Sequence, residues 1–169
     1  MGQLHGLAER IHNVADELPL TDSRYTRSDD LDELDERVRD IAGLVTHLTT
    51  AAAFEDRSVN SGQGPSADVT RYKVAALTHT VRALAQALAH LGEAVSQAGR
   101  LHRLDALPRS AERSKAQQSA RNAVNERIDS TRRDLNEAGR QLHHAANRLT
   151  ARQGTTTPPP LPRQSPRTR

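Results

Sequence analysis

Apolar residues recur in an unbroken alternation of three- and four-residue steps over residues 74–98. This spacing places them on one narrow stripe of a helix, because an α-helix turns once per ~3.6 residues and a 3.5-residue repeat nearly matches that turn. The stripe consists of Val74, Leu77, Val81, Leu84, Leu88, Leu91, Val95 and Ala98. It predicts a long helix from about residue 66 to residue 104 that packs against other helices.

Two earlier stretches repeat this pattern. The first predicts a shorter helix over residues 3–18, which Pro19 ends because proline lacks a backbone N–H and clashes with the preceding turn. The second predicts a helix that begins near Ser28, whose hydroxyl can cap free amide groups. The two stripes are Leu4, Leu7, Ile11, Val14 and Leu18, and then Leu31, Leu34, Val38, Ile41, Val45, Leu48 and Ala52.

A fourth helix is predicted from Ser110 to about Arg152, but its stripe is apolar only in the second half. That half carries Val124, Ile128, Leu135, Ala138, Leu142, Ala145 and Leu149. Continuing the register backwards reaches polar residues at 121, 117 and 114. The first half is therefore expected either to pack through Ala116, Ala120 and Ala123 or to pack loosely.

These four stretches predict an all-α fold, an antiparallel coiled-coil-like bundle of three long helices plus a shorter N-terminal helix packed on one half. The bundle spans residues 1–153. Residues 154–169 contain five prolines and form a predicted disordered Pro- and Arg-rich tail. With 24 Ala, one Phe and no Trp, the core is expected to be a thin seam without an internal cofactor pocket.

Several classes of function conflict with this composition. The absence of cysteine excludes disulfides, thiolate catalysis and thiolate-ligated zinc. No nucleophile with a base, paired carboxylate or glycine-rich phosphate loop is present, so we expect no enzyme activity and no cofactor. No signal peptide or membrane span is evident, which predicts a cytoplasmic protein. The preference for Arg over Lys suggests a GC-rich bacterial genome.

Charge is distributed unevenly along the chain. Residues 1–60 carry 6 basic and 13 acidic side chains, residues 61–105 carry 5 and 3, and residues 106–169 carry 13 and 5. In an up-down bundle the acidic start of the second helix lies at the same end as the basic start of the fourth. Mutual neutralisation of these two helices is the first interpretation.

The alternative is that the basic fourth helix and tail contact the phosphates of a nucleic acid. The candidate residues are Arg132, Arg133, Arg140, Arg148, Arg152, Arg163, Arg167 and Arg169. The missing aromatic interleaving and the acidic first half of the chain count against this interpretation.

Eight histidines and an acidic run raise the question of a metal site. No two histidines share a helix face at metal-ligand spacing, and residues 29–36 lack the central glycine of a calcium loop, so we predict no metal ligand. His102 is expected to be buried or half-buried at the end of the third stripe. The other histidines are predicted on outward faces or beside a stripe, namely His47, His79, His90, His143 and His144.

Two short motifs concern partners. Tyr25-Thr-Arg-Ser-Asp29 resembles the Tyr-x3-Asp export signal of type VII secretion substrates, which are helical hairpins. The usual Trp-x-Gly turn is absent, and the match precedes the hairpin. Pro158-Pro-Pro-Leu-Pro162 resembles a ligand of proline-binding domains, and a stiff spacer with a basic end is the simpler interpretation.

Together these patterns predict a noncatalytic helical interaction or scaffold protein. Seams that are rich in Ala are often completed by another chain, so self-association or a protein partner is expected. A nucleic-acid-associated accessory protein is the alternative, and no small-molecule substrate or membrane is indicated.

Overall fold

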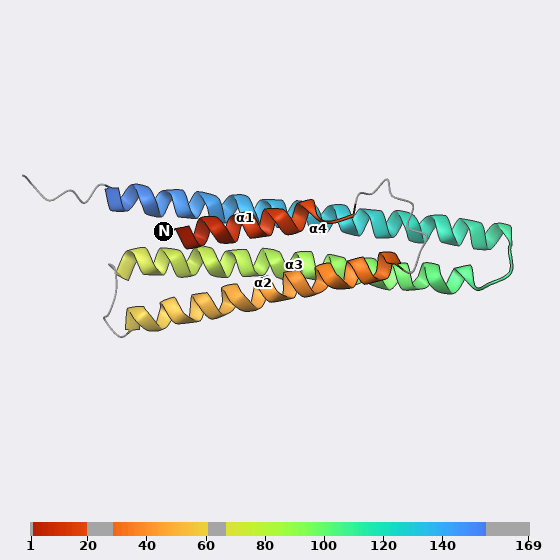
Figure 1. The fold of residues 1–169 in the computed structure, drawn as a ribbon, viewed down its shortest axis with the longest axis horizontal. Coiled ribbons are helices and arrows are strands. Elements are labelled where there is room, and N and C mark those ends of the chain that lie inside the picture. Colours follow the sequence, from red (N-terminus) through yellow and green to blue (C-terminus); the bar gives the residue numbers. More distant parts are fainter. Residues whose placement is uncertain (1, 20–28, 61–66, 155–169) are drawn as a thin grey trace, which may run out of the picture.

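The computed structural model describes residues 2–19, 29–60 and 67–154, which contain four helices and no strand (Figure 1). The helices are α1 (Gly2–Asp16), α2 (Asp29–Asn60), α3 (Ala67–Asp105) and α4 (Ala111–Gly154). The all-helical prediction is confirmed, and the predicted limits of α1, α3 and α4 and the predicted start of α2 lie within two residues of the observed ones. None of these helices is long and apolar enough to cross a membrane. The predicted tail beyond Gly154 lies outside the described residues.

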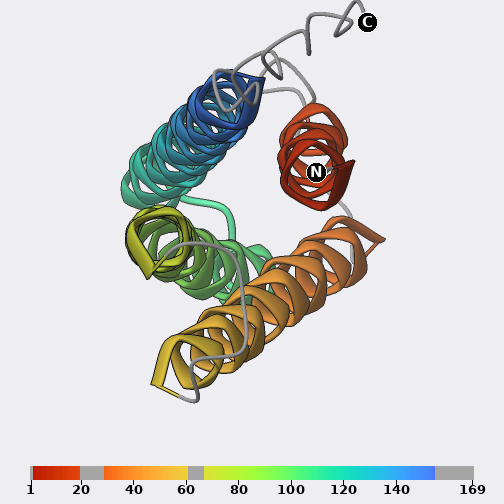
Figure 2. The same cartoon turned by 90° about the vertical axis from the view of Figure 1, so that its left-hand side faces the viewer.

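Successive helices run antiparallel and surround a shared core (Figure 1). In cross-section their order is α1, α4, α3, α2, so that α2 lies diagonally opposite α4 (Figure 2). The central helix α3 packs on both α2 and α4, whereas α1 packs mainly on α4 and only locally on α2. The prediction of a shorter first helix on one half of the bundle is therefore confirmed.

The two ends of the bundle differ in construction. At one end, α3 and α4 extend past α1 and α2 as a two-helix hairpin, which we call the hairpin end (Figure 1). At the other end, α1 and α3 begin while α2 and α4 finish, and we call this the four-helix end. The difference in helix length is the cause, since α1 has 15 residues and α4 has 44.

The predicted stripe of α4 forms part of the core, and the stripe of α3 does so in part. All seven predicted apolar positions in the second half of α4 are buried. On α3, Leu77, Leu84 and Leu91 are buried, but Val81 and Leu88 are only half-buried. The prediction of one stripe is therefore confirmed for the leucines at 77, 84 and 91, whereas Val81 and Leu88 pack against the core only at its edge. The other buried positions of α3 include Thr80, Ala87, Ala94 and Leu101, and the carbonyl of Ala87 lies against α4.

Small side chains along this contact bring α3 and α4 close together. The Thr131 hydroxyl of α4 lies 3.4 Å from the backbone carbonyl oxygen of Ala87 on α3. The same hydroxyl also donates to the Arg127 carbonyl at 2.8 Å, so this buried polar group is satisfied. Alanine and threonine permit this approach because they have little side-chain volume beyond Cβ.

The first half of α4 packs through alanine, which was one of the two predicted alternatives. Ala120 is buried, and Ala116 and Ala123 are half-buried. Ser110 caps the helix as predicted, because its hydroxyl accepts a hydrogen bond from the backbone N–H of Arg113 at 3.1 Å. The α4 start is thus held by local contacts at the hairpin turn.

Charges are neutralised between neighbouring helices, so the predicted pairing of α2 with α4 was wrong. On α2, Arg37 binds Asp40 at 2.8 Å and reaches Glu17, just after α1, at 2.5 Å. On α4, Arg127 binds Glu93 of α3 at 2.6 Å. The physical reason is the diagonal placement of α2 and α4, which keeps their side chains apart across the core.

Paired truncations on α3 test this register. Leu84→Ala should lower the free energy of unfolding by ~2–5 kcal/mol, because Leu84 is 0% exposed and its removal leaves a cavity. Leu88→Ala should cost roughly 1 kcal/mol, since a half-buried side chain loses less transfer free energy. Urea denaturation of both variants measures the difference, and equal losses would contradict the observed register.

Candidate functional site

Three histidines lie in the interface that holds α1 on α4. His12 on α1 and Asn136 on α4 form a hydrogen bond between Nδ1 and Oδ1 at 3.1 Å. The His5 and His143 rings meet edge to face with their centroids 4.6 Å apart. Beside them, Gly139 leaves room for the His12 ring, because an added Cβ would lie 2.6 Å from its Nε2. These contacts position α1 on α4, so a structural role explains why the three histidines lie there.

Two histidine predictions were wrong. His90, predicted on the outward face, is half-buried, and its Nε2 lies 3.6 Å from Asp134 Oδ2 of α4. The reason is that this side of α3 lies against α4. His102, predicted at the buried end of the stripe, is exposed because α2 does not extend along the hairpin end. His47, His79 and His144 are exposed, as predicted.

No cluster of three or more potential metal ligands occurs among the described residues. The acidic start of α2 uses some of its carboxylates otherwise, since Asp35 binds Arg39 and Asp40 binds Arg37. Residues 20–28, which hold most of the Tyr25–Asp29 motif, lie outside the described residues.

Arg132, the first of the predicted phosphate-contacting residues, holds the end of α1. Its guanidinium donates to the carbonyl oxygens of Leu18 at 3.1 Å and Pro19 at 2.8 Å. It also binds Asp129 at 3.0 Å. Leu18 and Pro19 follow the last residue of α1, so their carbonyls lie outside the helix and need another donor, which Arg132 supplies. In this structure Arg132 is therefore committed to the fold, which argues against its predicted role.

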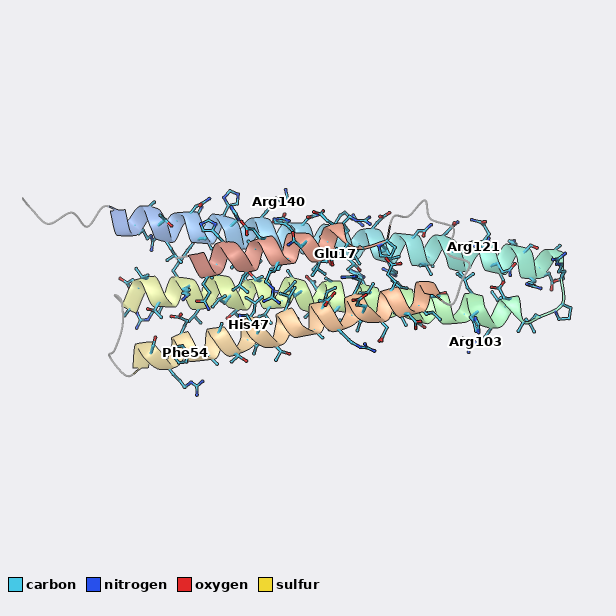
Figure 3. All side chains as sticks on the ribbon, viewed as in Figure 1. Glu17, His47, Phe54, Arg103, Arg121 and Arg140 are labelled. Carbon is cyan, nitrogen blue, oxygen red and sulfur yellow. The ribbon has the colours of Figure 1, made fainter. Side chains whose placement is uncertain are left out.

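Four of the remaining candidates lie on the described part of α4, three of them exposed along the helix and one near its end. Arg133, Arg140 and Arg148 are exposed on α4, where Arg140 binds Glu137 at 2.6 Å (Figure 3). Arg152, in the last turn of α4, lies over the Tyr72 ring of α3 at 5.2 Å. Three predicted residues in the tail, Arg163, Arg167 and Arg169, lie outside the described residues.

A cleft opens at the four-helix end between the start of α1, the end of α2 and the start of α3. Its volume is about 290 Å³, near the lower limit of ligand pockets, which suits a few side chains and not a cofactor. Figure 3 shows two of the lining residues, His47 and Phe54, on α2. The lining residues are Gln3, Leu4, Leu7, His47, Thr50, Ala51, Phe54, Glu55, Lys73 and Leu77.

The cleft combines a closed apolar floor with an exposed aromatic rim. Leu7 and Leu77 are nearly completely buried and form part of the floor, whereas Phe54 is 67% exposed. At one side Lys73 of α3 forms an ion pair with Glu55 of α2. An exposed phenylalanine beside an apolar hollow is a common feature of surfaces that bind peptides or proteins.

A second hollow, of about 350 Å³, lies at the hairpin turn and is lined by Arg109, Ser110, Arg113 and neighbouring polar residues. Its polar groups already serve the turn. Arg113 donates to the carbonyl oxygens of Leu107 and of Asp105, the latter at 3.2 Å, and Ser110 caps α4. This hollow therefore has a structural explanation.

Comparison of the chain with protein-family models, curated proteins and solved structures finds no match. The candidate surfaces are thus interpreted from their own chemistry. Of the two hollows described above, the cleft at the four-helix end is the one that borders an exposed large apolar side chain, Phe54.

Sequence reasoning missed the residues that define this cleft and the α1 interface. Phe54 is the only phenylalanine and lies off the predicted α2 stripe, so a lone exposed aromatic residue was a readable signal. His5 and His12 are seven residues apart, a spacing that places both on one side of α1. The cleft itself depends on how three helices diverge, which no single stripe encodes.

Two glycine substitutions test the α1–α4 interface. Gly139→Ala should cost ~1–3 kcal/mol of stability, because the new methyl group displaces His12 from Asn136. Gly92→Ala on α3, where an added Cβ meets nothing within 4 Å, should instead stabilise by roughly 0.5–1 kcal/mol through helix propensity. Thermal unfolding gives both values.

The same Gly139→Ala change in a His12→Ala background shows whether the loss of stability comes from the clash with the His12 ring. Removing the ring should abolish most of the cost of Gly139→Ala. An unchanged cost in that background would mean that the close approach of His12 is not responsible.

Proposed function

We propose that this chain is a noncatalytic helical scaffold that binds a protein partner through the cleft at its four-helix end. The observation that carries the proposal is the one-sided attachment of α1. Contacts with α4 bury its apolar stripe, while its face toward α2 stays open beside Phe54. We propose a noncatalytic role because the sequence contains no recognisable set of catalytic residues. The three- and four-residue periodicity supports coiled-coil-like packing as part of the proposal.

Self-association through the hairpin end is the second part of this proposal. Of the helices that the structure describes, only α3 and α4 build that end, and their buried residues there are few, among them Ala98, Leu101 and Ala120. Leu107, at the turn, is 53% exposed. A two-helix hairpin with so thin a core gains buried apolar area when a second hairpin packs against it.

Phe54 and Leu107, the two exposed large apolar residues of the described part of the chain, provide a matched test, because they lie at opposite ends of the molecule. Leu107→Asp should weaken the dimer by at least about tenfold, since a charge would be buried at the interface. Phe54→Asp should leave the dimer intact. Light scattering over a concentration series measures the mass of each variant. A strict monomer at high concentration for the parent chain would refute self-association.

A nucleic-acid-associated role remains the second candidate. The observation in its favour is the exposed row of Arg133, Arg140 and Arg148, whose spacings of seven and eight residues place them on one side of α4. Arg132 does not belong to this row, because it holds the end of α1. Duplex nucleic acid is the expected ligand, since no aromatic side chain accompanies the row for base stacking.

Charge reversal tests this candidate. Replacing Arg133, Arg140 and Arg148 by Glu should weaken duplex binding at low salt and lower the salt slope by about 3, one unit per lost phosphate contact. The matched control reverses Arg82, Arg100 and Arg103, which are exposed on α3. Fluorescence anisotropy across salt concentrations measures both. Absence of binding by the parent chain, or equal losses in both triple variants, would exclude the α4 row as the contact surface.

A further inference from the structure

The four-helix end carries both the cleft and the end of α4, after which residues 155–169 follow. Figure 2 views the molecule from this end and shows all four helices meeting there. The segment contains Pro158-Pro-Pro-Leu-Pro162, and its last residues include Arg163, Arg167 and Arg169. An apolar, proline-rich segment thus follows directly from the end of the molecule that has an open apolar cleft.

The last turn of α4 contacts the helix that forms one wall of the cleft. Arg152 lies over the ring of Tyr72, which places the end of α4 on the first turns of α3. The next residue of α3, Lys73, lines the cleft and is paired there with Glu55 of α2. The segment therefore starts beside the helix that forms one wall of the cleft.

The distance is within reach of the proline motif. A polyproline II segment rises ~3.1 Å per residue, so Leu161, the seventh residue after Gly154, can lie up to about 22 Å from the end of α4. A helix with its side chains is about 10 Å wide, and the segment has to pass only one helix, α3, to reach the cleft. The reach of Leu161 is therefore about twice the width of α3.

The chemistry of the cleft matches that of the motif. Proline-rich segments in the polyproline II conformation bind grooves lined by aromatic residues, since their backbone is already extended and loses little entropy. Phe54 offers an exposed ring, and Leu4, Leu7 and Leu77 offer an apolar floor for Leu161. Of the acidic residues of α2, only Glu55 and Asp56 lie near the cleft, and Glu55 is paired with Lys73, so the match rests on apolar contacts and not on charge.

We propose that residues 158–162 of this chain occupy the cleft between α1, α2 and α3, with Leu161 on its floor and the prolines against Phe54. The inference rests on the cleft being the docking surface proposed above. Because the segment is tethered, its effective concentration at the cleft is in the millimolar range, and even a weak site is filled. A protein partner then has to displace the segment, or to present a similar one.

A tryptophan reporter tests this inference in the full-length chain. The sequence has no Trp, so Phe54→Trp places a single indole at the rim of the cleft. Adding Pro160→Asp and Leu161→Asp should expose the indole, seen as a red-shifted emission and stronger quenching by acrylamide. Pro166→Asp and Gln164→Asp make the same charge change outside the motif and should have no effect. Leu107→Trp, at the hairpin end, should not respond to either pair.

A synthetic peptide of residues 155–169 completes the test. It should bind the Pro160→Asp, Leu161→Asp chain in the Phe54→Trp background and restore the shielded emission. The parent Phe54→Trp chain should bind it about tenfold more weakly, because the tethered segment competes.

Each other outcome overturns the inference, and the outcomes separate it from the proposed function. Equal peptide binding by both chains would show a docking cleft that the tethered segment does not occupy. Shielding that depends on protein concentration would assign the cleft to the tail or body of a second copy. If the peptide does not bind and the emission does not change, both the inference and the cleft-based part of the proposed function are refuted.

Discussion

The close packing of α3 on α4 is the contact on which the other helices depend. The hydroxyl of Thr131 on α4 lies against the backbone carbonyl of Ala87 on α3, where the small side chain of Ala87 lets the two backbones approach. Dispersion contacts increase as helices approach, so a seam of small residues compensates in part for its lack of volume. The two longest helices thus form a rigid frame, and α2 and α1 attach to its four-helix half.

The cleft follows from the way α1 is attached to that frame. Arg132 holds the carbonyls at the end of α1, and Arg37 binds Glu17 at the same place. The start of α1 is held by His5 and by apolar contacts with α4, with little support from α2. One end of α1 is therefore fixed by charged hydrogen bonds to two helices, while the other leaves the space that Phe54 borders.

Much of the fold was readable from sequence because each helix carries its own stripe and its own end signals. Pro19 and Ser110 marked boundaries correctly, since their effects act within one turn. The buried face of α3 was predicted only in part. A stripe shows which positions carry large apolar side chains, but it does not show where small residues let two helices approach closely. Ala87 and Ala94 are more deeply buried than Leu88 because of how α3 packs against α4, which lies far away in sequence.

The candidate site was less predictable for a related reason. Arg132 belonged to a basic helix by composition, yet its position opposite the end of α1 decides its role. The cleft arises from three helices that diverge, so its floor residues looked like ordinary core positions. A residue such as Phe54 was visible in the sequence, but its environment depends on the tertiary arrangement.

The attachment of α1 to α4 also constrains how the chain folds. The contacts from Arg132 to Leu18 and Pro19 join residues 114 and 113 positions apart. During synthesis the first helix emerges long before its main partner, so its apolar stripe stays unpaired until nearly the whole bundle has been made. Contacts of such high sequence separation form late and slowly. The attachment of α1 therefore has to wait until α4, the last of the described helices, has been made.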